Sequence, residues 1–458
     1  MFLGACRLKP RVLAFALVIC AAMSILSCSS SSHTATTSAS GIVDRVVVSQ
    51  EVTSATSIGG LVLINGNIDI LAGGPPLPAG SSPGLMAINP ARSILTAFDE
   101  SSNNVYALNT ATAKSIGQVH LPGPTFSMEI PTSNPVGYAA VPSANILGYP
   151  VLGAVEVMNF TSGSLITIAV SAAQTVVPNN TGSQLLVFSN DSNSVTLLNP
   201  ADAVPPLDTS CFGNANPPPN PPVCTVINGF DRPVFAVVSG NTAYILNCGA
   251  ECGGTQASIQ TLDLNSLAVG APIPVNGATW AYLSGTKLYV AGSGTPTGQL
   301  CASLTNSVNA KTAATYCGTL DIVNLTTMTD PYFKNPGAEI AIPDGYHDRM
   351  DMSSNGQLFV GSKDCTNIGN VNNPSGEVRG CLAILNTNTG GVVIPPDNGD
   401  VTGLQSFTSR DVEYVAEDGN LRVYDTLTDA LLINPDYLPL GTIPVVGYAD
   451  DVKAIDFF

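Results

Sequence analysis

Short apolar runs in which hydrophobic and polar residues alternate recur along most of this chain. They come in pairs: a first run, a polar connection of variable length, and a second run that ends near Asn or Asp. Alternation with a period of two predicts β-strands whose two faces have different surroundings. The pair occurs eight times, with first runs at 45–50, 94–99, 137–142, 185–190, 243–248, 287–292, 357–362 and 412–417 and second runs at 61–67, 104–110, 154–160, 194–200, 258–264, 319–325, 381–387 and 420–426.

An additional apolar run precedes most of these pairs, but the first pair lacks it. The additional runs read PGLMAIN, FSMEI, PVFAVVS, TWAYLS, HDRMDMS and GLQSFTS. Only residues 41–44 and a Ser/Thr-rich stretch precede the first pair, whereas the final residues DDVKAIDFF have the missing alternation. We therefore expect residues 450–458 to pair inside the first unit, because this closes a ring and removes unpaired sheet edges.

The amino-acid sequences of several pairs resemble a known repeat. The stretches KLYVAGSG, NNVYALNTATAKSIG and NLRVYDTLTDALLI resemble the YVTN-type β-propeller repeat, in which a Tyr-Val strand and a Val-Asp strand are followed by a Thr-rich turn. The resemblance covers roughly residues 43–458 and implies four-stranded antiparallel blades around an axis. We expect an all-β chain that forms a single β-propeller. The repeat count gives eight blades, and one miscounted repeat would give seven.

Composition agrees with this fold class. Charged residues make up only 11% of the chain, against about 25% in an average soluble domain. Glycine (43 residues) and proline (34 residues) are abundant, as expected of a turn-rich all-β protein.

The N-terminus has the pattern of an export signal. Arg7, Lys9 and Arg11 precede an apolar stretch at 12–26 that is short for a membrane span. Ile25-Leu26-Ser27-Cys28 resembles a bacterial lipobox, which implies cleavage before Cys28 and lipid attachment to it. We expect residues 1–27 to be a lipoprotein signal peptide, 28–42 a flexible Ser/Thr linker and 43–458 the propeller. The alternative is an ordinary signal peptide with an incidental cysteine.

The charge balance limits the partners. After the leader, 13 basic and 33 acidic residues remain, a formal charge of −20. Nucleic-acid binding depends on neutralising phosphates with Lys and Arg, so we expect no nucleic-acid partner. The expected association is with a membrane through the lipid anchor, on the periplasmic side or at the cell surface, together with an envelope protein or a small-molecule ligand.

The remaining cysteines predict disulfides. Two of the 11 cysteines lie in the leader and Cys28 is the lipidation candidate, so eight are left, an even number in a chain with an export signal. A zinc site would call for closely spaced pairs with histidines nearby, but the chain has one CxxxC and no histidine around it. The simplest pairing joins neighbours in sequence: Cys211–Cys224, Cys248–Cys252, Cys301–Cys317 and Cys365–Cys381.

Loop lengths predict one elaborated face. The connection between the two runs of a pair varies most in length, and in a propeller such loops share a face with the blade-to-blade connections. Three predicted disulfides fall in these loops, and we expect the fourth, Cys211–Cys224, on or near the same rim. Long loops are frequent binding surfaces, although tolerated insertions braced against proteolysis would give the same pattern.

A second repeat indicates a polar cluster at the channel mouth. The stretches GFDRP (229–233), GYHDRM (345–350) and GYADDV (447–452) each place glycine, an aromatic residue and charge where an inner strand begins. Convergent polar groups in a concavity are a common form of binding site, but Asp–Arg pairs that satisfy strand ends would also explain them. The candidate residues are Asp231, Arg232, Trp280, His347, Asp348, Arg349, Asp450 and Asp451.

These observations favour binding of a protein or small ligand through the loop-rich face over catalysis. One alternative is a lactonase-like propeller hydrolase with an acidic site at the channel mouth, assisted by a divalent cation such as Ca²⁺. The other alternative is a structural protein of the cell envelope. No other cofactor is expected, and the fold alone does not choose between these functions.

Overall fold

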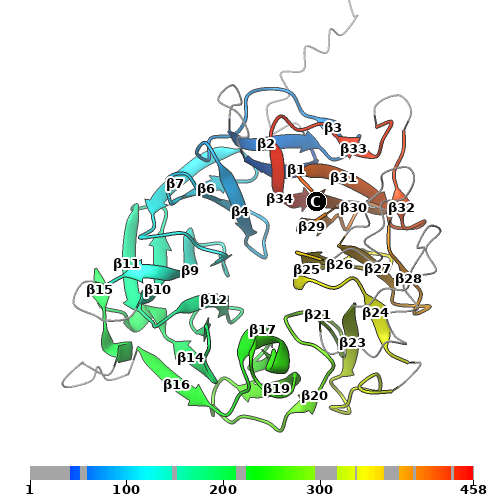
Figure 1. The fold of residues 1–458 in the computed structure, drawn as a ribbon. Helices are drawn as coiled ribbons and strands as arrows, with labels where there is room; N and C mark the ends of the chain where they lie inside the picture. The colour runs from blue at the N-terminus through cyan, green and yellow to red at the C-terminus, as the bar shows by residue number, and fades with distance from the viewer. Residues whose placement is uncertain are drawn as a thin grey trace, which may run out of the picture.

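The structure, a computed structural model, describes residues 42–51, 59–146, 152–212, 223–293, 317–335, 338–365, 381–395, 399–434 and 438–456. These residues form eight sheets around a central axis, so the prediction of an eight-bladed β-propeller is confirmed (Figure 1). Helical structure in these ranges is confined to short 3-10 turns, namely η2 (Pro200–Asp202), η3 (Ser210–Phe212) and η4 (Gly249–Cys252).

Each blade contains four antiparallel strands that follow one another outward from the axis. The innermost strands are β34 (Tyr448–Asp456), β4 (Pro83–Ile88), β8 (Ser127–Glu129), β12 (Ala173–Pro178), β17 (Pro233–Ser239), β21 (Trp280–Ser284), β25 (Tyr346–Met352) and β29 (Val401–Ser406). The second strands are β1 (Asp44–Glu51), β5 (Ile94–Asp99), β9 (Val136–Asn145), β13 (Leu185–Ser189), β18 (Thr242–Asn247), β22 (Lys287–Gly292), β26 (Gln357–Lys363) and β30 (Val412–Glu417).

The outer half of each blade is less regular. The third strands are β2 (Gly60–Asn65), β6 (Asn104–Asn109), β10 (Leu152–Asn159), β14 (Ser194–Leu198), β19 (Ser258–Asp263), β23 (Gly318–Asn324), β27 (Leu382–Asn386) and β31 (Asn420–Asp425). The outermost strands are β3 (Ile70–Leu71), β7 (Lys114–His120), β11 (Ser164–Ala169), β16 (Cys224–Asn228), β20 (Ile273–Pro274), β24 (Ile340–Ile342), β28 (Val392–Val393) and β32 (Ala430–Leu431). Two short strands add to this edge: β15 (Leu207–Asp208) runs parallel to β11, and β33 (Thr442–Ile443) pairs with β31.

The C-terminal strand closes the ring, as the sequence predicts. β34 pairs antiparallel with β1, with Ala454 opposite Val46 and Val452 opposite Val48. Figure 1 shows β34, coloured red, beside β1, coloured blue. Blade 1 is therefore built from both ends of the described chain, and the inner edge of β1 is paired.

A buried ion pair strengthens the same junction between blade 8 and blade 1. The Arg410 guanidinium donates to both carboxylate oxygens of Asp69, at 2.7 and 2.8 Å, and the Tyr414 hydroxyl also donates to Asp69. A bidentate Arg–carboxylate pair has a fixed geometry, so it sets the orientation of the two blades as well as linking them.

The hydrophobic core lies between neighbouring blades. Successive residues of β1 alternate between the two sides of its sheet: Val47 packs against Leu95 of blade 2, whereas Val46 and Val48 pack in the cluster that contains Tyr414 of blade 8. Because both faces of a blade are covered, a second strand such as RVVVSQ can be apolar almost throughout. A ring of such contacts makes each blade depend on its two neighbours.

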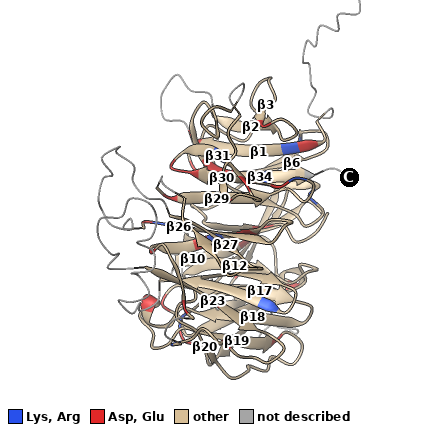
Figure 2. Cartoon of the chain, turned by 90° about the vertical axis from the view of Figure 1, so that its right-hand side faces the viewer, with Lys and Arg blue, Asp and Glu red and all other residues tan. Residues whose placement is uncertain are grey.

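Strand direction assigns every connection to one of two faces. Connections from second to third strands, and from one blade to the next, lie on one face, which we call the loop face. The turns from first to second strands and from third to outermost strands lie on the other face; Figure 2 shows the ring edge-on, with few charged residues on the ribbon. The innermost strands begin at the loop face, so their first residues surround its channel opening.

Three predicted disulfides are present, but one is not where the sequence analysis expects it. Cys248–Cys252 and Cys365–Cys381 lie in second-to-third connections on the loop face. Cys211–Cys224 closes the third-to-outermost connection of blade 4, because Cys224 begins β16 opposite Leu198 at the end of β14. Its predicted place on the loop-face rim is wrong: β16, the outermost strand, is not apparent in the sequence pattern.

The fourth predicted disulfide is only partly within the described ranges. Cys317 precedes β23 on the loop face and is disulfide-bonded. Its predicted partner Cys301 lies outside the described residues, so that pairing stays a prediction. Among the residues that the structure describes, there is no helix with the length and hydrophobicity needed to cross a membrane.

The ring closure predicts the effect of truncating one side chain of β34. Ile455 is 1% exposed and packs between blades 1 and 2. Ile455→Ala should lower the free energy of unfolding by about 2–5 kcal/mol, measured by urea denaturation, because it leaves a cavity at the closure. Leu427→Ala, at a turn residue that is 66% exposed, is the matched control and should change it by about 0.5 kcal/mol or less. An unchanged midpoint for Ile455→Ala would contradict this role of β34.

A buried carboxyl in blade 3 predicts a specific pH dependence. Burial raises the pKa of Glu156 from 4.5 to about 7, although Thr167 donates a hydrogen bond to it at 2.8 Å. The folded chain thus binds this proton more tightly than the unfolded chain does. The resulting stabilisation is complete below about pH 4.5 and is lost as the pH rises toward 7.

Glu156→Gln should remove that loss, because the amide stays neutral at every pH. The free energy of unfolding of the variant minus that of the wild type should rise between about pH 5 and pH 8, by on the order of 2–3 kcal/mol. Urea denaturation at a series of pH values measures this difference. A difference that does not vary with pH would show that Glu156 is ionised in the folded chain.

Candidate functional site

The central channel contains a cavity of about 320 Å³. All eight innermost strands, or the residues directly before them, contribute to its wall, so it is a property of the closed ring. The lining residues are Leu85, Met86, Ala87, Ile88, Phe126, Ser127, Met128, Glu129, Gln174, Thr175, Phe235, Trp280, Tyr346, Asp348, Arg349, Gln405, Asp451 and Lys453. The wall combines aromatic, apolar and charged groups, which is the usual composition of a small-ligand site.

Aromatic rings form one part of the wall. The rings of Phe235 and Trp280 are stacked, with centroids 3.9 Å apart and an interplanar angle of 19°. Tyr346 and Phe126 also line the cavity and remain 48% and 66% exposed. Large exposed aromatic side chains inside a concavity are available to a ligand in a way that core aromatics are not. Trp280 is also the single tryptophan of the chain.

Charged side chains on β25 and β34 form another part of the wall, and Lys363 of β26 lies beside them. Asp348 pairs with Lys363 at 3.0 Å and with Arg349 at 3.5 Å. The Lys453 ammonium contacts both carboxylate oxygens of Asp451, at 2.8 and 3.0 Å. Each basic group in this part of the wall is therefore already neutralised by an aspartate of the chain itself.

The inner strands direct these side chains by a recurring irregularity near their first residues. In β25 the pairing shifts between His347 and Arg349, which leaves Asp348 as an extra residue. The same shift leaves Asp450 as the extra residue in β34. Such a bulge redirects a side chain that regular pairing would point to the other face. Similar shifts occur near the starts of β4, β12, β17 and β29.

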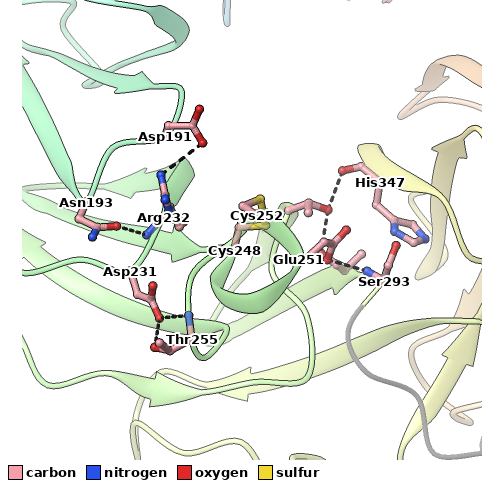
Figure 3. Close-up of a disulfide and its surroundings, with 12 residues drawn as sticks. Asp191, Asn193, Asp231, Arg232, Cys248, Glu251, Cys252, Thr255, Ser293 and His347 are labelled. Atoms are coloured by element: carbon pink, nitrogen blue, oxygen red, sulfur yellow. Dashed lines mark hydrogen bonds and ion pairs between the residues drawn. A yellow bond between two sulfur atoms is a disulfide. The ribbon is translucent and has the colours of Figure 1, made fainter.

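The rim beside the cavity is held by the disulfide turn η4 (Figure 3). Backbone amides of Thr255 and Gln256 each donate to the Asp231 carboxylate at 2.9 Å, and the Ser293 amide donates to Glu251 at the same distance. The pKa of Asp231 is lowered, since these hydrogen bonds outweigh the opposing effect of burial. Asp231 thus fixes the loop that follows η4.

A second cavity, of about 340 Å³, adjoins the first at this rim. The two share Gln174, Thr175 and Tyr346, so they form one continuous concave surface from the channel to the loop face. Arg232 and Cys252 line the outer cavity, and Arg232 pairs with Asp191 at 3.3 Å, as Figure 3 shows.

His347 has a structural role instead of facing the channel. It is 1% exposed, and its Nε2 lies 3.0 Å from the carbonyl oxygen of Pro343. Burial lowers the pKa of His347 to about 4, so the ring is neutral near pH 7. Gly318 leaves room for this ring, since a Cβ there would lie 2.6 Å from Cε1. His347 thereby holds the turn that precedes β25.

Two further acidic groups lie at the channel opening beside Gly84. A Cβ on Gly84 would lie 2.8 Å from a Glu100 oxygen and 2.9 Å from an Asp450 oxygen. Burial, together with Asp451 and Glu100, raises the pKa of Asp450 to about 6. In the part of the chain that the structure describes, no three His, Cys, Asp or Glu side chains are arranged to hold a metal ion. A divalent cation at this opening therefore stays a prediction.

The structure thus brings together only some of the residues singled out by sequence. Trp280, Asp348, Arg349 and Asp451 line the channel cavity, and Arg232 lines the adjoining one. Asp450 lies beside the opening, while Asp231 and His347 support the rim. Sequence reasoning missed Glu129, Phe126, Phe235, Tyr346 and Lys453 as wall residues; Tyr346 is the aromatic residue of the GYHDRM stretch, which could have identified it.

Comparison with known proteins confirms the fold and nothing finer. No protein-family model and no curated protein sequence matches the chain. Among solved structures, dihydro-heme d1 dehydrogenase NirN in complex with DHE is 12% identical, with 90% of this chain and 75% of that chain covered and a TM-score of 0.55. Hydrazine synthase of Kuenenia stuttgartiensis is 14% identical over 79% and 82% of the two chains, with a TM-score of 0.42. At such identities the likeness to NirN establishes the propeller architecture alone.

Proposed function

We propose that this chain is an exported, lipid-anchored β-propeller that binds a small ligand in the channel cavity, from the loop face. The observation that carries the proposal is the cavity itself. It is lined by every blade, and it presents exposed aromatic rings beside fixed polar groups. Its basic groups are held by aspartates of the wall, so the charges have defined positions before a ligand arrives, and pre-organisation of this kind favours binding.

The disulfides support export. Three are present in the described residues, and structural disulfides are typical of proteins outside the cytosol. Two of them brace loops on the loop face, where Cys252 itself lines the outer cavity. The lipobox-like stretch at 25–28 supplies the proposed attachment point for the lipid. The YVTN-type sequence pattern is consistent with the propeller but does not identify a ligand.

The proposed anchor predicts the fate of one cysteine. In a bacterium that processes lipoproteins, the chain should incorporate radiolabelled palmitate and sediment with membranes. Cys28→Ser should abolish labelling and leave the chain with its leader uncleaved at that site. Cys20→Ser, a cysteine in the apolar part of the leader, is the control and should be labelled normally. Labelling of Cys28→Ser would contradict the proposed anchor.

The proposed binding site can be tested with the single tryptophan. Trp280 emission should be quenched by acrylamide in the folded chain, because the indole lines an open cavity. A ligand found by screening small molecules for a saturable change in this emission should protect Trp280 from acrylamide. Phe235→Ala should lower the affinity for that ligand by about tenfold, since stacked aromatic contacts contribute roughly 1 kcal/mol beyond the effect of the apolar area that they bury.

The control is Met328→Ala, because Met328 is 37% exposed and lines an outer-edge groove remote from the channel. Its ligand affinity should equal that of the wild type. A Trp280 that acrylamide cannot reach would contradict the proposal directly. So would a ligand whose affinity is unchanged by Phe235→Ala.

A further inference from the structure

Glu129 differs from the other charged groups of the channel wall. It ends β8 and lines the cavity, yet within the described ranges no donor is hydrogen-bonded to its carboxylate and no basic group forms an ion pair with it. Burial raises its pKa to about 7, and Lys453 only partly opposes this effect. A carboxylate in the wall of a cavity without an ion-pair partner is an unusual feature in a chain that has so few charged residues.

The nearby basic groups are already occupied. Both carboxylate oxygens of Asp451 contact the Lys453 ammonium, and Asp348 pairs with Arg349. The Arg349 guanidinium also donates to the Thr402 carbonyl oxygen at 2.9 Å. The charges lining the cavity therefore sum to a small negative excess, and that excess resides on Glu129.

The acidic excess extends to the channel opening. Asp450 and Glu100 approach each other there, and Glu51 and Asp99 contribute further repulsion at Glu100. Lys363 and Arg349, the basic groups that offset Asp450, are both already paired with Asp348. A cation that enters from the loop face thus moves through a negative potential toward Glu129, whereas an anion is repelled along the same path.

The aromatic wall fits the same class of ligand. Faces of Trp, Tyr and Phe rings attract cations through their quadrupole, by roughly 0.5–2 kcal/mol depending on desolvation. Trp280, Phe235 and Tyr346 line the cavity that contains Glu129, and none of them is fully buried. A ligand with an ammonium group and an apolar body would use both parts of this wall.

We propose that the channel cavity binds a small organic cation, an amine or a quaternary ammonium compound, with Glu129 as its counter-charge and the rings of Phe235, Trp280 and Tyr346 as its aromatic contacts. This inference rests on the proposed ligand-binding function and specifies the ligand class for the same cavity.

The test uses three probes of nearly identical shape. Choline carries a quaternary ammonium group, dimethylbutanol replaces that nitrogen by carbon, and dimethylbutyrate adds a negative charge. Binding to the folded chain is measured by calorimetry and by Trp280 emission at about pH 8, where Glu129 is ionised. Choline should bind saturably and at least about tenfold more tightly than dimethylbutanol, and dimethylbutyrate should bind most weakly.

The role of Glu129 is tested with a matched pair of variants. Glu129→Gln should lower the affinity for choline by about tenfold or more and leave the affinity for dimethylbutanol unchanged. The substitution removes the counter-charge and keeps the shape of the side chain. Glu156→Gln makes the same chemical change in the same blade outside the cavity, and choline affinity should not change. Thermal melting of both variants verifies that each is folded.

The outcomes separate the ligand class from the binding function. Equal or tighter binding of dimethylbutanol or dimethylbutyrate would overturn the cation proposal and leave ligand binding in the cavity supported. Failure of all three probes, with Trp280 open to acrylamide and another ligand found by screening, would likewise overturn only the ligand class. If acrylamide cannot reach Trp280, the binding function fails as well.

Discussion

The pairing of β34 with β1 is the constraint on which the rest of this structure depends. Without it, blade 1 would lack its inner strand, β1 would present an unpaired edge to the channel, and the inner strands of blade 8 would lose the strand that packs beside them. The Asp69–Arg410 pair reinforces the same junction. Because the cavity takes its wall from all eight blades, its shape exists only when this junction is formed.

The chain uses its few charged residues in a concentrated manner. Seen edge-on, the ribbon carries few charged residues (Figure 2), whereas the channel wall gathers acidic and basic side chains, most of them in defined pairs. Ion pairs in a partly buried site are held more rigidly than surface pairs, because fewer water molecules compete for them. The cavity thereby has a fixed pattern of charge, and among its charged lining residues Glu129 is the exception.

The strands and their closure could be predicted from sequence because alternation has a direct physical cause. Runs such as ILTAFD and VEYVAE coincide with β5 and β30, and residues 450–456 form β34 as expected. The shortest outermost strands, β3, β20, β28 and β32, could not be predicted in the same way, because two residues carry no periodicity. The misplacement of Cys211–Cys224 has a different cause: its position depends on β16, a five-residue strand shortly after the proline-rich stretch at 217–222 that no run of the repeat pattern predicts.

The candidate site was predictable as a region but not in its detail. The Gly-aromatic-charge stretches correctly indicate that β25 and β34 bring Asp348 and Asp451 to the channel. One extra residue in a strand reverses the direction of the side chains that follow it. No residue type in the sequence indicates the position of that extra residue. Because of such an extra residue in β25, Asp348 and Arg349, adjacent in sequence, both line the cavity, where regular alternation would point them to opposite faces. Glu129 lies in FSMEI, one of the additional apolar runs, but outside the Gly-aromatic-charge stretches that indicate the site.

The closure of blade 1 also has a consequence for the order of events in biogenesis. The hydrogen bond between Ser49 and Asp451 spans 402 residues, so the first blade to be synthesised is the last to be completed. Contacts between distant residues form slowly, because a long loop must first be ordered. The ring therefore cannot close until its last strand has been synthesised, and the native packing between blades 8 and 1 is completed only at the end of folding.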